Sequence, residues 1–316
     1  MTDSRTPTPE PVRLLAGGGL HLTADRWGHP DHPPVLLLHG AGQNRRAWDD
    51  TAHAIAQAGW HAVTVDHRGH GDSDWPDAAD YDFDDFADDV LALLDHLPTP
   101  PVIVGASLGG MSALLAQART TTQLFRAVVL VDVTPRMELR GVQRIVGFMA
   151  AHPDGFDTLD QASEIIATYT GRPKPASPDG LRQVLRQDDT GRWRWHWDIR
   201  FLDGRADMIL DADPDQLREN PIRERLHAGA HNIRVPTLVV RGAQSDLVSP
   251  EGVQEFVDAV PGARYIDVAD AGHMVAGDQN DHFTAAILDF LHTLRTDNPP
   301  HDHGEGHDQR TRDGRT

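Results

Sequence analysis

The sequence contains no cysteine and no apolar run long enough to cross a membrane. Without cysteine the chain has no disulfide, no thiolate nucleophile and no cysteine-ligated metal site, and nothing in it demands an oxidising compartment. The opening residues MTDSRTPTPEPVR also lack the apolar core of a signal peptide. These absences predict a cytoplasmic protein with no membrane span.

Positive charge is scarce as well. Lys174 is the only lysine, and 29 Lys and Arg stand against 48 Asp and Glu, which gives a formal net charge of −19 over 316 residues. Nucleic acid phosphates and anionic membrane surfaces repel a chain of this charge. We therefore expect neither nucleic acid nor a membrane as a partner.

What the sequence does have is a regular alternation of two patterns. Short, continuously apolar segments, such as VLLL at 35–38 and VIV at 102–104, are typical of buried strands. Between them lie amphipathic segments, such as DFDDFADDVLALLDHL at 82–97, that are typical of helices with one buried face. Buried strands joined by helices predict an α/β fold, a doubly wound parallel sheet covered on both faces.

The alternation also predicts how the chain is divided. Residues 1–12 are rich in Pro, Thr and Ser, and we expect a flexible N-terminus there. The core is predicted over 13–133 and 234–296. Between these, at 134–233, the alternation stops, which predicts an inserted cap or lid. The tail 297–316 is polar and aperiodic and is predicted to be disordered, although its histidines could bind a metal ion.

The segment Gly105-Ala106-Ser107-Leu108-Gly109 matches the pattern G-x-S-x-G. In a nucleophile elbow this serine lies on a sharp strand-to-helix turn, with its hydroxyl above the sheet. Small neighbours suit the turn because a side chain at either glycine would collide with the bent backbone. We expect Ser107 to be a nucleophile, although small residues also occur at ordinary strand-to-helix turns.

A serine hydroxyl needs a base to take its proton and a carboxylate to orient that base. His273 follows the last predicted strand and Asp246 follows the strand before it, so both are expected at the same sheet edge as Ser107. Asp132, at the end of VVLVD, is an alternative acid, and Asp246 could instead cap the next helix.

The reaction also needs two N–H donors for the oxyanion of an acyl-transfer intermediate. The backbone N–H of Leu108, directly after the serine, is one candidate. The other is the N–H of Ala41, in the segment HGAGQN at 39–44. Nothing in these motifs calls for a cofactor or a metal ion.

Together with DHRGHGDS at 66–73, these motifs resemble the serine branch of the α/β-hydrolase superfamily from about Leu20 to Arg295. The resemblance implies a mostly parallel eight-stranded sheet, with a helical cap inserted after strand 6. It also implies that segment 66–73 is largely structural. Relatives that open epoxides or remove halide carry aspartate at the elbow, so Ser107 argues against both reactions.

The resemblance leaves several functions open, because esterases, lactonases, carbon–carbon hydrolases and perhydrolases share one triad. We expect a serine hydrolase that cleaves a small to medium, mostly apolar ester or lactone through an acyl-enzyme. One alternative is a cofactor-free perhydrolase, in which hydrogen peroxide replaces water. Another is a ligand sensor that turns over slowly.

Trp193, Trp195 and Trp197 stand at alternate positions, so they share one face if the segment is extended. One interpretation makes them, with Phe148, an aromatic wall of the substrate pocket. The other makes them packing residues that hold the cap to the core.

Overall fold

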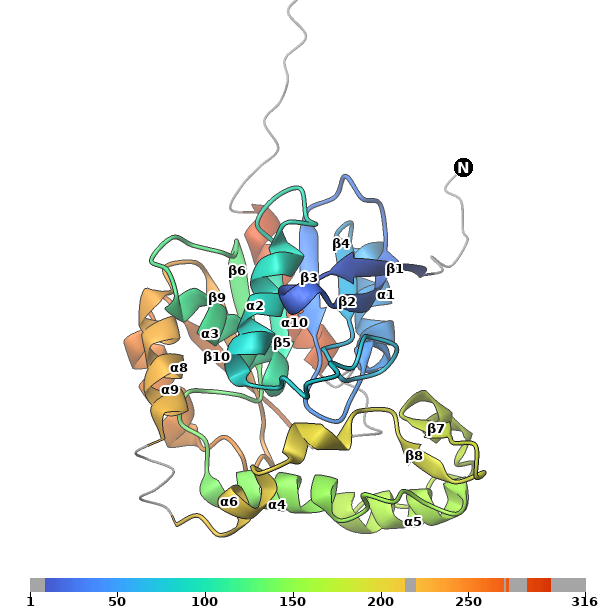
Figure 1. The fold of residues 1–316 in the computed structure, drawn as a ribbon. Helices are drawn as coiled ribbons and strands as arrows, with labels where there is room; N and C mark the ends of the chain where they lie inside the picture. Colours follow the sequence, from blue (N-terminus) through green and yellow to red (C-terminus); the bar gives the residue numbers. More distant parts are fainter. Residues whose placement is uncertain (1–8, 214–219, 270, 273–282, 297–316) are drawn as a thin grey trace, which may run out of the picture.

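The computed structural model describes residues 9–213, 220–269, 271–272 and 283–296 (Figure 1). Its main sheet has eight strands in the order β1-β2-β4-β3-β5-β6-β9-β10. The strands are β1 (Glu10–Leu15), β2 (His21–Trp27), β3 (Pro34–Leu38), β4 (His61–Val65), β5 (Val102–Ala106), β6 (Ala127–Val131), β9 (Thr237–Gly242) and β10 (Arg264–Val268). Only the pairs β1·β2 and β2·β4 are antiparallel, so the predicted mostly parallel sheet is confirmed.

The central strands have the apolar runs that the sequence predicts. Every residue of β3, β4, β5, β6 and β9 is buried. A strand that is buried on both faces needs apolar side chains at successive positions, which explains why these segments do not alternate. The edge strand β10 is mostly exposed instead.

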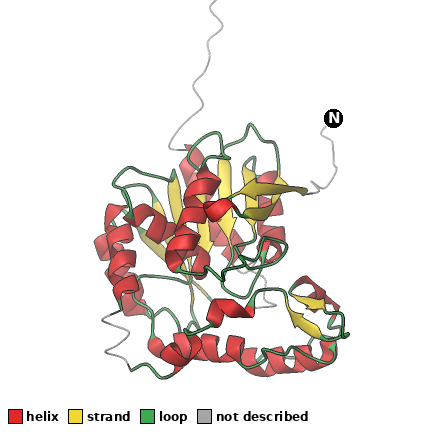
Figure 2. Cartoon of the chain, viewed as in Figure 1, coloured by secondary structure: helices red, strands yellow, loops and turns green. Residues whose placement is uncertain are grey.

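Helices cover both faces of the sheet (Figures 1 and 2). One face packs against α2 (Phe83–Leu94), α3 (Leu108–Ala118), α8 (Pro221–Asn232) and α9 (Pro250–Ala259). The other face packs against α1 (Asp49–Gln57) and α10 (Thr284–Thr296). Buried side chains from these helices therefore form one apolar cluster on each side of the sheet.

Between β6 and β9 the chain forms a separate layer beyond the sheet, drawn below it in Figure 1. The elements of this insertion are α4 (Leu139–Ala150), α5 (Leu159–Thr170), η3 (Asp179–Gln183), β7 (Leu185–Gln187), β8 (Trp193–Trp195), η4 (Ile199–Leu202) and α6 (Ala206–Leu210). Helix α8 also falls within the predicted cap at 134–233, yet it packs against α3. A Cβ on Gly229 would lie 2.0 Å from the carbonyl oxygen of Leu114, so the two helices are in close contact.

The predicted flexible N-terminus, 1–12, is too long. Glu10 and Val12 pair with Arg26 and Ala24 of β2, because β1 and β2 form a hairpin around the turn η1 (Gly17–Gly19) and β1 begins at Glu10. Residues 1–8 and the tail 297–316 lie outside the described residues.

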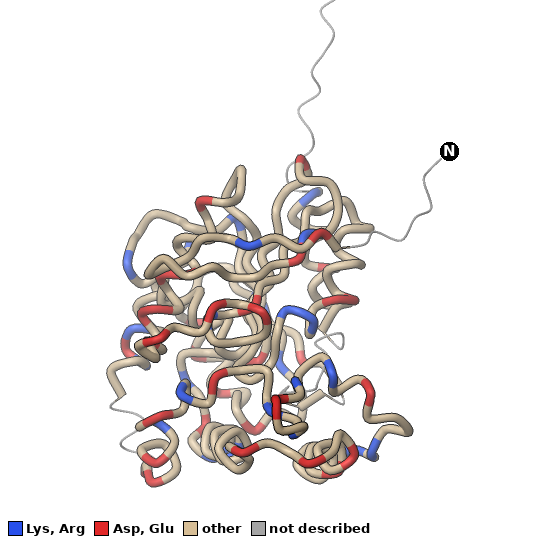
Figure 3. Tube along the Cα trace, turned by 45° about the vertical axis from the view of Figure 1, so that its right-hand side comes forward, with Lys and Arg blue, Asp and Glu red and all other residues tan. Residues whose placement is uncertain are grey.

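Charged residues are distributed over both the sheet domain and the insertion, with acidic and basic side chains interspersed (Figure 3). Many arginines pair with aspartates; Arg119, for example, contacts both Asp84 and Asp88. Within the described ranges, no helix combines the length and apolar character that crossing a bilayer requires.

Candidate active site

Ser107 lies on the turn between β5 and α3 with φ 44° and ψ −111°. A positive φ is unfavourable for a residue with a side chain, and such strain is often found at functional sites. The N–H of Ser107 donates to Val131 O at 3.1 Å, and its carbonyl accepts from Met111 N at 2.9 Å. Strand β6 and the first turn of α3 thus hold Ser107 in this sharply bent conformation.

The two glycines of the motif allow three backbone segments to meet here. A Cβ on Gly105 would lie 2.5 Å from Gly110 N, and one on Gly109 would lie 2.5 Å from Leu38 O. Either contact is shorter than packed atoms tolerate. The glycines therefore let α3 begin directly against β5 and β3, as the sequence pattern predicts.

The loop after β3 lies directly against Ser107. A Cβ on Gly40 would be 3.4 Å from the Cβ of Ser107. Gln43 N donates to Gly40 O at 3.1 Å, and Gly42 has φ 77°, a combination typical of a type II turn over 40–43. This turn places the backbone of Ala41 beside the Ser107 turn.

The two candidate oxyanion donors face no acceptor in the described part of the chain. Neither the N–H of Ala41 nor that of Leu108 donates a hydrogen bond to another described residue. Ala41, Ser107 and Leu108 all line the same cavity. As far as the described residues go, the hydroxyl and both donors are available to one bound molecule.

The cavity has a volume of about 1200 Å³ and lies between the elbow and the insertion. Its apolar wall includes Met111, Met137, Val142, Ile145, Val146, Met149, Leu202 and Ile222. Its charged lining includes Arg136, Glu138, Arg140, Arg205, Arg223 and Asp246. A mostly apolar cavity with a few polar groups is typical of a small-molecule site.

The predicted aromatic wall needs correction. Trp193, Trp195, Trp197 and Phe148 are not among the residues that line this cavity. The ring of Trp195 packs edge-on to Phe148, with centroids 5.9 Å apart, and both belong to an apolar cluster of the insertion. As the alternate spacing predicts, the indoles lie in one environment. That environment is the packed apolar cluster of the insertion, and it is not the cavity wall.

Asp132 is 2% exposed and has φ 49°, so it is a second strained residue at the end of a strand. One carboxylate oxygen accepts from Gly242 N at 3.2 Å, and the other accepts from Ser245 Oγ at 2.8 Å. These bonds fix the carboxylate between the ends of β6 and β9. Strand β6 is the direct neighbour of β5, which carries Ser107.

Asp246 lies in the loop after β9 and is 41% exposed at the side chain. Its two oxygens accept from Nε and Nη2 of Arg144, at 2.5 and 2.8 Å. Because Arg144 belongs to α4, this ion pair joins the loop to the insertion, and the carboxylate raises the pKa of Arg144. The predicted base, His273, lies outside the described residues.

Three buried histidines, His39, His67 and His70, pack against the turn over 40–43. The sequence analysis assigned them no role. His39 Nδ1–H donates to Gly40 O at 2.8 Å, and His67 N–H donates to His39 Nε2 at 3.0 Å. His70 Nε2 accepts from Gly42 N–H at 3.2 Å. Burial lowers the pKa of His67 to about 3 and that of His70 to about 4, and it holds the pKa of His39 well below 6.5.

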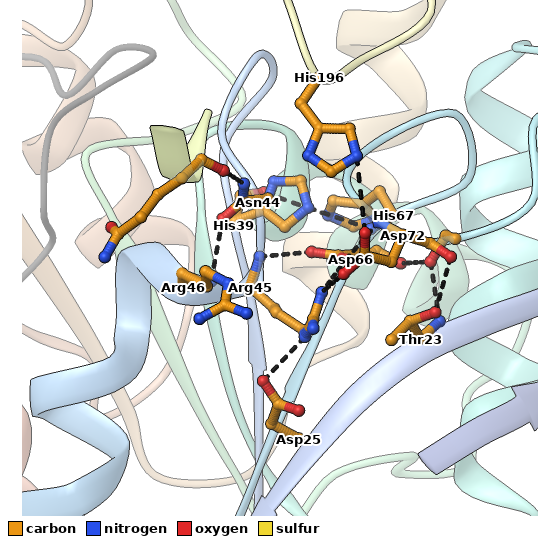
Figure 4. Close-up of polar contacts among 12 residues, drawn as sticks. Thr23, Asp25, His39, Asn44, Arg45, Arg46, Asp66, His67, Asp72 and His196 are labelled. Carbon is orange, nitrogen blue, oxygen red and sulfur yellow. Dashed lines mark hydrogen bonds and ion pairs between the residues drawn. The ribbon is translucent and has the colours of Figure 1, made fainter. Parts of the chain in front are cut away.

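An ionic cluster, buried except for the exposed side chain of Asp72, contacts the same loop (Figure 4). The guanidinium of Arg45 pairs with Asp25, Asp66 and Asp72 at 2.8, 2.5 and 2.9 Å. The backbone N–H of Arg45 also donates to Asp66 at 2.6 Å. Segment 66–73 is thus structural, as the resemblance implies, and it specifically braces the loop beside Ser107.

In the described ranges, no group of three or more His, Asp or Glu side chains is placed to hold a metal ion.

Known proteins resemble this chain over most of its length. The family described as alpha/beta hydrolase fold matches residues 33–278. A non-heme chloroperoxidase of Kitasatospora aureofaciens is 35% identical over 287 residues, 86% of this chain and 96% of that protein. An esterase of Mycobacterium tuberculosis is 29% identical over 282 residues, 86% of each chain. The crystal structure of an alpha/beta hydrolase from Novosphingobium aromaticivorans has a TM-score of 0.71 at 25% identity, covering 90% of this chain and 98% of that one.

Proposed function

Because the chain belongs to the alpha/beta hydrolase fold family, we propose that it is a serine hydrolase. It acts on ester bonds, and its substrate is a small to medium, mostly apolar carboxylic ester or lactone. The observation that carries this proposal is the strained Ser107, which lines an apolar cavity beside two N–H groups without acceptors in the described chain.

In the proposed mechanism, Ser107 Oγ attacks the ester carbonyl while His273 takes the hydroxyl proton. The N–H groups of Leu108 and Ala41 bind the oxyanion of the tetrahedral intermediate. His273 then gives its proton to the leaving alcohol, and an acyl-serine remains. Water repeats the sequence, releasing the acid and restoring the serine hydroxyl.

The contacts of the two candidate carboxylates favour Asp132 as the group that orients His273. An orienting carboxylate works best when it is buried and held by further hydrogen bonds, as Asp132 is. Asp246, which the sequence order favours, is more exposed and uses both oxygens to bind Arg144. We therefore assign the acid to Asp132 and keep Asp246 as the alternative.

A panel of p-nitrophenyl esters and lactones tests the proposal. Replacing Ser107 with alanine is expected to lower kcat by about 10⁴-fold or more, as loss of a triad nucleophile does. Ser163→Ala is the matched control, because Ser163 is a buried serine on α5, outside the cavity lining. Full turnover by Ser107→Ala, with Ser163→Ala also unchanged, would falsify the assignment.

A second candidate function is cofactor-free perhydrolysis, which the similarity to a non-heme chloroperoxidase favours. Here hydrogen peroxide attacks the acyl-serine in place of water, giving a peroxy acid and the free serine. Bromination of a dye in the presence of acetate, hydrogen peroxide and bromide measures this reaction, because the peroxy acid oxidises bromide to the brominating agent. A negligible peroxide-dependent rate beside rapid ester cleavage excludes it.

A further inference from the structure

We propose that His70 is a positioning residue for the oxyanion hole: its imidazole fixes the turn that presents the N–H of Ala41, and the insertion fixes the imidazole. This inference rests on the proposed hydrolase function. It gives segment 66–73 a part in the reaction that goes beyond supporting the fold.

The first step is the bond between His70 and the turn over 40–43. Type I and type II turns differ by a flip of the central peptide, which here joins Ala41 to Gly42. The N–H of that peptide is the group that donates to His70 Nε2, at 3.2 Å. A flip would place the Ala41 carbonyl where the N–H now lies, facing a second acceptor. His70 therefore selects the type II form. The N–H of Ala41 belongs to the preceding Gly40–Ala41 peptide, which this flip leaves in place, so His70 acts on that N–H by anchoring the turn that carries it.

The second step is the tautomer of His70. Its Nδ1–H donates to Arg68 O at 3.0 Å, which leaves Nε2 as an acceptor. The ring is buried, so both nitrogens need partners, and these two bonds supply them. The imidazole is thus restrained at both ends, and the Gly42 bond has a fixed direction.

The third step is the contact of the ring with the insertion. The indole of Trp197 stacks on His70 with centroids 6.3 Å apart and planes 22° apart. The backbone segments also pair: Gly71 N donates to His196 O at 2.8 Å, and Asp198 N donates to Gly69 O at 2.7 Å. The layer that covers the cavity therefore reaches the oxyanion loop through the His70 ring, in addition to the bond from Asn44 Nδ2 to Gln183 O.

Two substitutions separate positioning from packing. In His70→Gln the amide oxygen reaches about as far as Nε2 and can still accept from Gly42, whereas the shorter His70→Asn reaches only the Nδ1 position. We expect His70→Asn to lower kcat for p-nitrophenyl butyrate by about 10- to 100-fold, because small misplacements of catalytic groups cost up to about 100-fold. KM should change by less than about threefold, since ground-state binding is untouched.

Rescue by His70→Gln to within about threefold of wild-type kcat is the signature of the restored acceptor. His61→Asn is the matched control: it removes another buried histidine, on β4, and should leave kcat unchanged while lowering Tm. If folded His70→Asn keeps wild-type kcat, or if His70→Gln loses as much as His70→Asn, the inference is overturned.

Two further measurements keep the outcomes apart. Should His70→Asn not fold, Trp197→Leu replaces it, because this change loosens the ring without touching the loop; an unchanged kcat then overturns the inference. Ser107→Ala is assayed in parallel. If Ser107→Ala retains turnover, the proposed function is wrong. If Ser107→Ala loses turnover while the His70 variants keep it, the proposed function stands and His70 has no positioning role.

Discussion

At the scale of single residues, the site is marked by backbone strain. Ser107 and Asp132 both have positive φ, at the ends of the neighbouring strands β5 and β6. Each such residue costs about 1 to 3 kcal/mol, which the surrounding structure must offset. The sequence predicts the first through its glycine pattern. It cannot predict the second, because the residues that hold Asp132 by hydrogen bonds lie about 110 positions away in the sequence.

Strain at Ser107 has a measurable consequence. Ser107→Gly relieves the positive φ, whereas Ser107→Ala does not, because only glycine adopts this region freely. We expect Ser107→Gly to have a free energy of unfolding about 1 kcal/mol higher than that of Ser107→Ala, after the entropy cost of glycine. Urea unfolding of the two inactive variants measures the difference. Equal stabilities would contradict strain at this turn.

The two candidate acids give opposite expectations. Asp132→Asn should lower kcat by about 10⁴-fold, because the base loses the carboxylate that selects its tautomer. Asp246→Asn should lower it by about fivefold or less, since an exposed ion pair is worth at most about 1 kcal/mol. Steady-state kinetics on both variants distinguish the two candidates. A large loss of kcat in Asp246→Asn and a small loss in Asp132→Asn would show that Asp246 is the acid.

The aromatic residues show where a residue pattern stops being informative. Alternate spacing places Trp193 and Trp195 on one face of a strand, but period alone does not say what that face meets. In the structure it meets packed rings such as Phe156, whose centroid is 5.1 Å from that of Trp195. Among the elements that line the cavity, α4 contributes the most residues.

At the scale of elements, the strands and helices could be predicted because each carries its own signal. Buried strands need apolar runs, and helices on a sheet need one apolar face. The packing of α8 against α3 has no such local signal, since it depends on a close approach at Gly229. The contact of segment 66–73 with the loop over 39–44 is likewise a tertiary feature.

Because α3 and α8 are closely packed at Gly229, a larger residue at this position is expected to destabilise the protein. Alanine there would place its Cβ 2.0 Å from Leu114 O, so the helices must separate. We expect Gly229→Ala to lower the free energy of unfolding by about 2 kcal/mol, as overpacking does. Gly180→Ala is the control, because nothing lies within 4 Å of a Cβ at that position. Equal Tm values for the two variants would count against this contact.

The histidine cluster predicts sensitivity to acid. The pKa of His67 is about 3 in the folded chain and about 6.5 in the unfolded chain, so between these pH values only the unfolded state binds the proton. Stability from His67 is present above pH 6.5 and is lost as pH falls, by about 1.4 kcal/mol per pH unit. In His67→Gln the slope of unfolding free energy between pH 5.5 and 4.5 should decrease by that amount. An unchanged slope would show that folding does not lower this pKa.

At the scale of the whole molecule, the site is assembled from distant parts of the chain. The loop over 39–44, Ser107 and Asp132 follow parallel strands, whose carboxyl ends meet at one sheet edge. The insertion closes the cavity above them through α4. The proposed ester hydrolysis would then depend on the entire fold, because no single segment holds both the hydroxyl and the two candidate N–H donors.

The central claim is that acyl transfer passes through Ser107. The most direct test is mass spectrometry of wild-type protein quenched with acid during turnover of p-nitrophenyl acetate. The account predicts one added acetyl group on the peptide that contains Ser107, and none on that peptide in Ser107→Ala. Turnover with no acetyl group on Ser107, or an identical acetyl adduct in Ser107→Ala, would contradict it.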